Sequence, residues 1–188
     1  MPVPRPPGLS PGRRRRAYAA RHSEQRAAAR SSTLAADPPL VTFTNPVCPR
    51  GADPWVLRWR GAYYYCRSAR GRIHVSRSQR LHEVGKDPGQ VVWSPAPGTA
   101  WSRHLWAPEL HHLDGRFYVY LAADDGRNQN HRVYVLEGDA SDPLRPFALK
   151  GRLAGPEDRW AIDATVLSMD DGRRYPAAAG RTTAASAC

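Results

Sequence analysis

Long apolar runs are missing from this sequence of 188 residues. No stretch approaches the roughly 18 apolar residues that a membrane-spanning helix requires, so we predict no association with a membrane. The basic run Arg13–Arg16 is followed by alanines and polar residues rather than by an apolar segment. The sequence therefore does not indicate a secretory signal peptide.

Cysteine is scarce, with only Cys48, Cys66 and Cys188 in the whole chain. Their odd number argues against a disulfide framework, and their spacing fits no common metal site. We therefore expect a reduced, cytoplasmic setting, while export of a longer parent protein stays open. The sequence also has no phosphate-binding loop, dinucleotide motif or nucleophilic serine or cysteine constellation, so we predict neither a cofactor nor a metal ion.

Acidic residues are few at the two ends of the chain, which has a formal net charge of +11. Residues 1–40 contain eight arginines but only Glu24 and Asp37, with almost no large apolar side chains. Such a segment cannot bury enough surface to offset its ordering entropy, so we interpret it as a disordered basic extension or a misplaced start. Arginine-rich segments attract nucleic acid, but without interleaved aromatics or a recognisable binding fold this function is not favoured.

Helical periodicity is nearly absent, and from Val41 onward the sequence consists of short alternating runs separated by turn residues. The 18 prolines, 15 glycines, six tryptophans and eight tyrosines are typical of short strands joined by turns. The expected strands are 54–59, 62–66, 71–76, 91–93, 109–113, 117–121, 132–136 and 162–167. The sequence therefore predicts an all-β fold.

One hairpin pattern recurs along the chain. The turn motifs Gly61–Tyr64, Gly115–Tyr118 and Gly172–Tyr175 are separated by 54 and 57 residues. An acidic residue precedes each turn; in chain order these are Asp53, Glu109 and Asp163. A four-stranded unit that recurs at about this length indicates the blades of a β-propeller. Chance similarity among three hairpins is the alternative.

Residues 41–175 are too few for a complete ring, because propellers have about 4–8 blades. We expect them to cover about two and a half blades of the propeller. After Tyr175 the chain continues with a proline and a small-residue stretch that has no strand pattern. We therefore interpret residues 176–188 as an aberrant, non-propeller tail of a truncated or frameshifted chain.

The repeat predicts where the acidic residues gather. The first strand of each blade is innermost, so acids at the ends of successive first strands converge although they are about 50 residues apart in sequence. Convergent carboxylates beside aromatic rings suit glycoside hydrolysis, in which one carboxylate activates water and a second group protonates the leaving oxygen.

The motifs that surround these acids resemble glycoside hydrolase family 43, and most of all its exo-acting α-L-arabinofuranosidases. The segments that carry the resemblance are 44–47, 51–56, 102–111, 134–139 and 160–167. The resemblance implies a five-bladed β-propeller that releases arabinose or xylose from plant oligosaccharides and polysaccharides with inversion of configuration.

Carried over by position, the resemblance implies that Asp53 is the general base and that Asp163 raises the pKa of the general acid. Like-charge repulsion keeps a carboxyl group protonated when a second carboxylate is nearby. The family places its acid, a glutamate in a Glu-Gly-Pro motif, about one repeat beyond Asp163, and nothing in this chain matches it. We therefore expect impaired hydrolysis, and a non-catalytic carbohydrate-binding propeller fragment is the alternative.

Three further residues are expected to contact the sugar. Trp106 and His104 are predicted to line the sugar pocket, although a tryptophan on an inner strand also suits the core. Glu109 is interpreted as a pocket-lining residue rather than as the acid. The remaining histidines are interpreted as structural, and the oligomeric state is left open.

Overall fold

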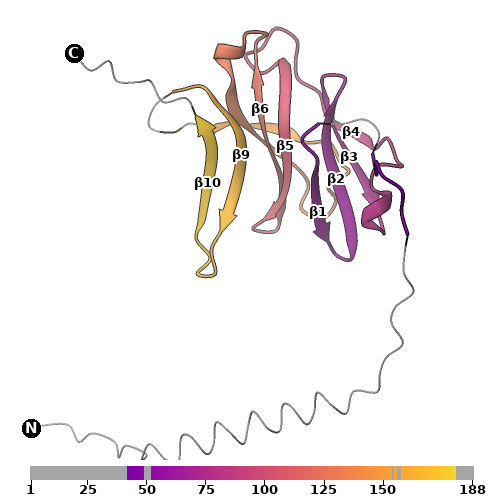
Figure 1. Ribbon diagram of the computed structural model, residues 1–188. Coiled ribbons are helices and arrows are strands. Elements are labelled where there is room, and N and C mark those ends of the chain that lie inside the picture. Colours follow the sequence, from indigo (N-terminus) through magenta and orange to yellow (C-terminus); the bar gives the residue numbers. More distant parts are fainter. Residues whose placement is uncertain (1–41, 49–51, 154, 156–157, 181–188) are drawn as a thin grey trace, which may run out of the picture. The chain divides into compact units, whose positions relative to one another are not determined.

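The computed structural model describes residues 42–48, 52–153, 155 and 158–180. The described residues from Phe43 to Gly180 belong to one compact unit. The predicted basic extension, residues 1–40, lies outside the described residues. The strands, shown in Figure 1, are β1 (Trp55–Trp59), β2 (Ala62–Ala69), β3 (Arg72–Ser78), β4 (Gln90–Trp93), β5 (Arg103–Leu113), β6 (Arg116–Asp124), β7 (Arg132–Glu137), β8 (Ala148–Leu153), β9 (Ala161–Ser168) and β10 (Arg174–Gly180). Two single-turn 3-10 helices, η1 (Leu81–Glu83) and η2 (Asn128–Asn130), lie in loops.

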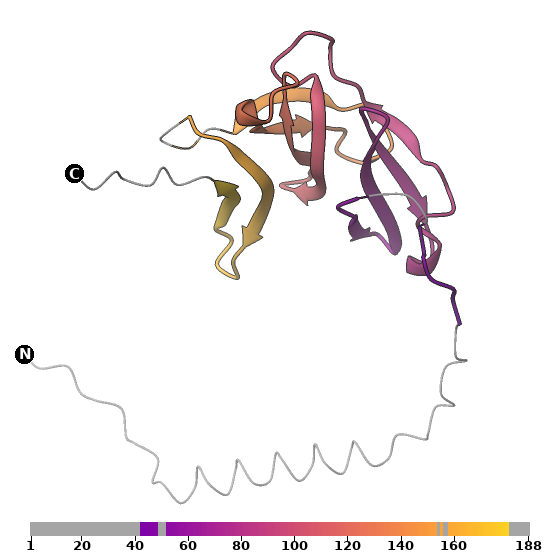
Figure 2. The ribbon, with the colours of Figure 1, turned by 45° about the horizontal axis from the view of Figure 1, so that its top comes forward.

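The strands form three antiparallel sheets that follow one another along the chain (Figure 2). The first sheet has the order β1-β2-β3-β4, the second has the order β5-β6-β7-β8, and the third pairs β9 with β10. Each four-stranded sheet therefore connects neighbouring strands in sequence order, as a propeller blade does. The prediction of an all-β fold with two full blades and the beginning of a third is confirmed.

Tight hairpins explain the regular meander of the first two sheets. Arg60–Gly61, Arg70–Gly71 and Asp114–Gly115 join successive strands, and both residues of each pair have positive φ. Two-residue turns with two positive φ values match the right-handed twist of the flanking strands. Glycine adopts this conformation without strain, which is why it occupies the second position.

The core lies between the first and second sheets. Phe117, Val119 and Leu121 of β6 are fully buried, and they pack in one cluster with Cys66 and Val75 of the first sheet. Trp59 of β1 closes this contact with an edge-to-face approach to Phe117, at 4.9 Å between ring centroids. Aromatic packing thus joins the inner strand of the first sheet to the second sheet.

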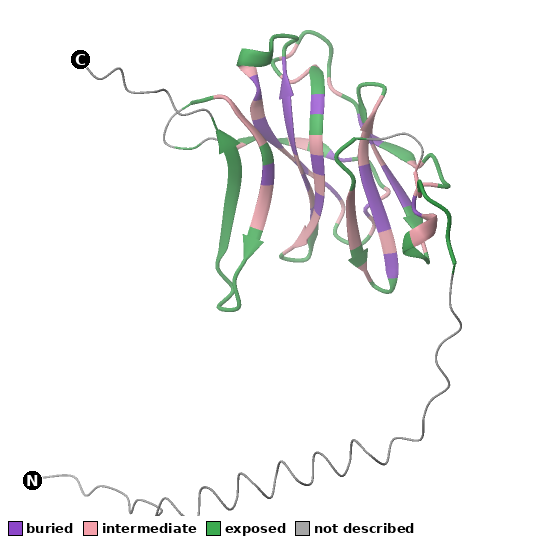
Figure 3. Cartoon of the chain, in the orientation of Figure 1, coloured by how far each residue is buried: buried purple, intermediate pink, exposed green. Residues whose placement is uncertain are grey.

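The third sheet differs from the expectation at its end. β10 includes Pro176 and continues to Gly180, so the interpretation that the tail from residue 176 has no strand structure is wrong for 176–180. Pro176 pairs with Val166, and β10 is an edge strand, where the missing N–H of proline is tolerated. Every residue of β10 is exposed (Figure 3). Residues 181–188 lie outside the described residues.

A second strand was missed in the sequence. β8 (Ala148–Leu153) is not among the strands expected from the sequence, and its ladder with β7 shifts register between Val135 and Leu136. Gly151 has a positive φ of 153° and no side chain, so one of the half-buried positions of β8 lacks the apolar residue from which a strand is recognised. Within the described part of the chain, no helix has the length and apolar character needed to span a membrane.

Candidate functional site

Asp53 lies immediately before β1, at the rim of a small hollow between the first and second sheets. The hollow has a volume of about 140 Å³ and is lined by Asp53, Pro54, Trp55, Ala107, Pro108 and Glu109. The Asp53 side chain is exposed, and its Oδ2 accepts a hydrogen bond of 3.4 Å from the backbone N–H of Ala107. A residue of β5 therefore orients the carboxylate that the sequence predicts to be the base.

Glu109 lines the same hollow from β5. Its Oε2 is 3.0 Å from Nε2 of His111, and both side chains are largely buried. The His111 ring also packs against Trp55, with ring centroids 4.9 Å apart. Burial lowers the pKa of His111, and the Glu109 carboxylate opposes that change only in part. Glu109 thus lies next to Asp53, while its hydrogen bond to His111 holds its side chain against β5.

Asp163 lies in β9 with an exposed side chain, and it does not line the hollow of Asp53. β9 packs against β5, and β5 packs against β1, so the three predicted acids come from neighbouring inner strands. Glu109 pairs with Tyr120 of β6, whose side chain lines a hollow shared with Val166 of β9. Glu109 and Tyr120 therefore lie on the same face of the second sheet.

Trp106 and His104 lie at the irregular beginning of β5. Trp106 is 37% exposed, and its ring stacks on His131 with centroids 4.0 Å apart. The His104 side chain is half-exposed, and its Nδ1 donates a hydrogen bond to Asp124. Neither residue lines the hollow of Asp53, but Ala107, which follows Trp106, does.

Asp124 and His131 form a buried polar centre that the sequence analysis missed. Both side chains are fully buried, and His131 Nδ1 is 3.0 Å from Asp124 Oδ2. Asp124 ends the apolar run of β6, where the side chains from Leu121 onward are all buried. A carboxylate in such a run is the signal that could have identified it, because a buried charge requires hydrogen-bonding partners.

Backbone strain is concentrated around the predicted acids. Beyond the hairpin turns, the non-glycine residues with positive φ are Asp53 at 50°, His104 at 43°, Ala107 at 41° and Asp163 at 52°. The left-handed conformation is unfavourable for residues with a side chain, and it persists where the surrounding structure imposes it. The two acids with proposed chemical roles are thus both held in a strained backbone.

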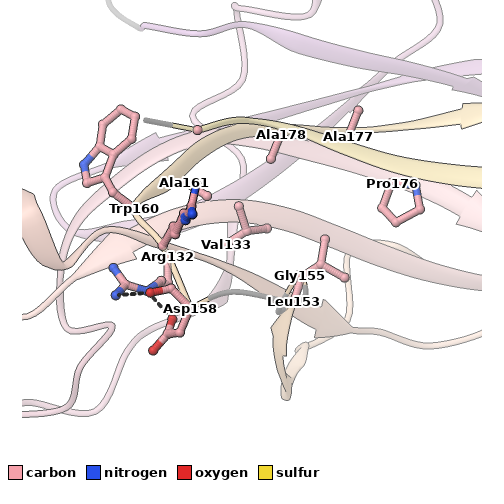
Figure 4. A pocket seen from close by; sticks show the side chains of 12 residues that line it. Arg132, Val133, Leu153, Gly155, Asp158, Trp160, Ala161, Pro176, Ala177 and Ala178 are labelled. Carbon is pink, nitrogen blue, oxygen red and sulfur yellow. Dashed lines mark hydrogen bonds and ion pairs between the residues drawn. The ribbon is translucent and has the colours of Figure 1, made fainter. Parts of the chain in front are cut away.

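Two larger hollows open between the second and third sheets. One, of about 280 Å³, is shown in Figure 4 and has Arg132, Asp158 and Trp160 along one side. Arg132 pairs with Asp158, and this hydrogen bond lowers the pKa of the Asp158 carboxyl group. Asp158, in the connection between β8 and β9, is therefore held to β7. The other hollow, of about 360 Å³, lies beside Tyr118 and Tyr120.

The chemistry of the described residues is that of carboxylates, imidazoles and aromatic rings. Among residues 42–48, 52–153, 155 and 158–180, no group of three or more His, Cys, Asp or Glu side chains has an arrangement that could hold a metal ion. Asp53 and Glu109 line one hollow, and Trp106, which has a partly exposed ring, precedes Ala107 of the same lining. Such an arrangement can bind a sugar and activate a water molecule.

Comparison with known proteins relates the chain to a group of glycoside hydrolases. The family "Glycosyl hydrolases family 43" matches residues 43–186. The chain is 35% identical over 151 residues to the extracellular exo-α-(1→5)-L-arabinofuranosidase of Streptomyces avermitilis, covering 78% of this chain and 31% of that protein. It is 32% identical over 153 residues to α-L-arabinofuranosidase 43 of Humicola insolens, covering 79% of this chain and 32% of that protein. It thus spans about a third of the length of these two relatives.

Solved structures show the same similarity. The α-L-arabinofuranosidase from Lactobacillus brevis matches with a TM-score of 0.69 and 30% identity over 77% of this chain and 48% of that one. A thermostable family-43 glycoside hydrolase matches with a TM-score of 0.58 and 26% identity over 72% of this chain and 44% of that one. The family match continues to residue 186, beyond the boundary at residue 175 that the sequence analysis set for the propeller.

Proposed function

The chain belongs to glycosyl hydrolase family 43 and covers about two and a half blades of the five-bladed β-propeller of that family. On that premise we propose that it contributes the general base of an arabinofuranosidase active site. The proposed reaction is inverting hydrolysis of terminal α-L-arabinofuranosyl residues of plant oligosaccharides or polysaccharides. The named relatives, which act on α-L-arabinofuranosyl groups by their descriptions, support this substrate class.

The position of Asp53 is the observation that carries the proposal. Its exposed carboxylate lies at the rim of the hollow and is oriented by the Ala107 N–H. An ionised carboxylate in that position can accept the proton of a water molecule that attacks the anomeric carbon. In an inverting site the base and the acid are roughly 6.5–9.5 Å apart, which leaves room for the water.

Asp163 is proposed to assist the acid rather than to act as base. Its place on β9, next to the strand that carries Glu109, suits a carboxylate that raises the pKa of a neighbouring acid by charge repulsion. Residues 1–188 contain no Glu-Gly-Pro motif. Loss of acid–base assistance typically lowers the rate by about 10²–10⁴-fold, so we expect a polypeptide of these residues alone to hydrolyse weakly.

Asp53→Asn in the full chain tests the proposal. We expect the unaltered chain to bind arabinofuranosyl oligosaccharides in a calorimeter and to hydrolyse 4-nitrophenyl α-L-arabinofuranoside slowly, and the variant to lose that hydrolysis while it retains binding. Asp87→Asn is the matched control, because Asp87 is an exposed carboxylate of the same sheet that accepts a hydrogen bond from Gly89. Equal hydrolysis by the unaltered chain and by Asp53→Asn would contradict the assigned base.

A carbohydrate-binding function without catalysis is the second candidate. The exposed ring of Trp106 favours it, because aromatic faces stack on the apolar faces of sugars. Binding without any hydrolysis, lost in Trp106→Ala, would support this candidate. Absence of both binding and hydrolysis would contradict both functions.

A further inference from the structure

Asp124 connects the elements around the candidate sugar site although it is fully buried itself. Its two carboxylate oxygens accept hydrogen bonds from Nδ1 of His104, at 2.9 Å each, and Oδ1 also accepts the N–H of Gly126 at 2.8 Å. Nδ1 of His131 is 3.0 Å from Oδ2. The partners of this buried charge are therefore two imidazoles and one backbone amide.

The hydrogen bonds of His131 define how its ring is held. Nδ1 faces Asp124 Oδ2 and the carbonyl oxygen of Asn128, and Nε2 faces the carbonyl oxygen of His104 at 3.2 Å. All of these atoms are hydrogen-bond acceptors, and they lie at both ring nitrogens, so the His131 ring is held from two sides.

Asp124 and His131 together hold the strained beginning of β5 in place. His104 and Ala107 have left-handed backbones, and the β5–β6 ladder shifts register on both sides of Trp106. The Asp124 carboxylate binds the His104 side chain, and His131 binds the His104 backbone. A strained segment keeps its conformation only when its surroundings impose it, and here they do so from both sides.

The same contacts reach the hollow of Asp53. The Trp106 ring stacks on His131 with centroids 4.0 Å apart and an interplanar angle of 25°. This stacking holds the partly exposed indole against the buried imidazole. Ala107, next in sequence, donates its N–H to Asp53. The position of the proposed base thus depends on a segment that Asp124 and His131 hold.

The contacts also reach the strand that carries Asp163. The N–H of Ala161, at the start of β9, donates to the carbonyl oxygen of His131 at 3.2 Å. The indole N–H of Trp160 donates to the carbonyl oxygen of Asn128 at 2.8 Å. Figure 4 shows Trp160 and Ala161 beside Arg132, the residue that follows His131. His131 is therefore linked to β9, which carries Asp163, and to β5, whose Ala107 orients Asp53.

We infer that Asp124 is a positioning residue of the sugar site, acting through His104 and His131 on Trp106 and Ala107. The inference rests on the proposed function and adds to it a buried residue that does not itself touch the sugar. Asp124 sets the His104 tautomer with the proton on Nδ1, which leaves Nε2 as a hydrogen-bond acceptor on the half-exposed side chain.

Asp124→Asn in the full chain tests the inference. Asparagine keeps the shape of the side chain, but its NH₂ group cannot accept an imidazole N–H, so one of the two histidines loses its partner. We expect affinity for an arabinofuranosyl oligosaccharide to fall roughly 10–100-fold, by analogy with the loss of residues that orient the ligands of a metal ion. Asp125→Asn is the matched control, because Asp125 is the next residue and binds Asn130 at the surface.

A double-variant cycle separates positioning from general destabilisation. If Asp124 acts through Trp106, Asp124→Asn will lower affinity much less in a Trp106→Ala background than in the unaltered chain. NMR provides a reading without sugar, since the Trp106 indole N–H and the Ala107 amide should shift in Asp124→Asn and not in Asp125→Asn. If Asp124→Asn does not fold, His131→Gln takes its place in both measurements, because its fully buried side chain cannot contact sugar.

The outcomes separate this inference from the proposed function. If the unaltered chain binds no sugar but Asp124→Asn still shifts the two resonances, the proposed function fails and the positioning role stands. If the resonances do not move, or if Asp124→Asn lowers affinity no more than Asp125→Asn does, the positioning role is wrong whatever the chain binds.

Discussion

The two contacts between neighbouring sheets are built differently. The first and second sheets meet through aromatic packing, in which Trp59 approaches Phe117 and Trp55 approaches His111. The second and third sheets meet through polar contacts, such as the pairing of Arg132 with Asp158, and two hollows of about 280 and 360 Å³ open between them. Asp53 thus lies at the tightly packed contact between the first and second sheets. Asp163 lies at the contact between the second and third sheets, which is open to water.

The difference shows that one site can lie between a contact of high stability and a contact of low stability. Apolar contact area contributes most of the stability of a fold, whereas ion pairs at the surface contribute little. We therefore expect the first contact to determine global stability and the second to determine how readily β9 separates from β5. Three experiments test this comparison.

Phe117→Ala should have the largest effect. Phe117 is fully buried against Trp59, and removal of a buried phenylalanine side chain costs about 3–5 kcal/mol of unfolding free energy. Urea unfolding of the full chain measures the loss. Leu167→Ala in the third sheet is the control; with its side chain 57% exposed, it should change stability by about 0.5 kcal/mol or less. Similar losses in the two variants would abolish the distinction between the contacts.

Trp55→Phe and Trp160→Phe compare two indoles that bridge neighbouring sheets. Trp55 Nε1 donates to the Leu110 carbonyl at 2.6 Å in a partly buried place, and Trp160 Nε1 donates to the Asn128 carbonyl at 2.8 Å in an exposed one. Loss of the first bond leaves a shielded carbonyl without a donor and should cost about 1–3 kcal/mol. Water replaces the second donor, so Trp160→Phe should cost about 0.5 kcal/mol or less. The midpoints of unfolding show whether Trp55→Phe loses more stability than Trp160→Phe, as we expect, or less.

Acidification should weaken the two contacts between sheets in different pH ranges. Among the three experiments, this one should give the smallest effect. Burial lowers the pKa of His111 from 6.5, so its contribution is complete above pH 6.5 and is lost as the pH falls through the lowered value. The hydrogen bond from Arg132 lowers the pKa of Asp158 from 3.8, so its contribution is lost only below pH 3.8.

Unfolding at pH 7, 5 and 3 measures both changes. His111→Gln should remove part of the loss between pH 7 and 5, and Asp158→Asn part of the loss between pH 5 and 3. His74, whose pKa burial also lowers, titrates in the upper range as well, so His74→Gln provides the comparison there. A pH dependence unchanged in both His111→Gln and Asp158→Asn would contradict the assignment.

Local features of the fold were predictable because they depend on neighbouring residues. Alternating apolar residues and turn pairs such as Asp114–Gly115 identified the hairpins, since side-chain alternation and positive φ are local properties. β8 was missed because Gly151, which has no side chain, occupies one of its half-buried positions. Pro176 was misjudged because the sequence does not show that its strand lies at an edge, where proline is tolerated.

The candidate site was predictable only where a motif marks it. Asp53, Glu109 and Asp163 were found from the repeat, and their chemical roles remain predictions. Asp124 and His131 were missed because their function depends on burial and on a contact across seven residues of loop and strand. The cytoplasmic setting expected from the cysteines also remains a prediction.

The sequence by itself determined the strand repeat, the family resemblance and the acid that precedes each repeated hairpin turn. All three depend only on the order of the residues. Only the tertiary structure decided which acid is exposed and which is buried. Asp53 and Asp124 are the same residue type, yet one faces a hollow and the other is enclosed by two imidazoles. Burial arises when separate strands pack together, and that packing gives each carboxylate its partners.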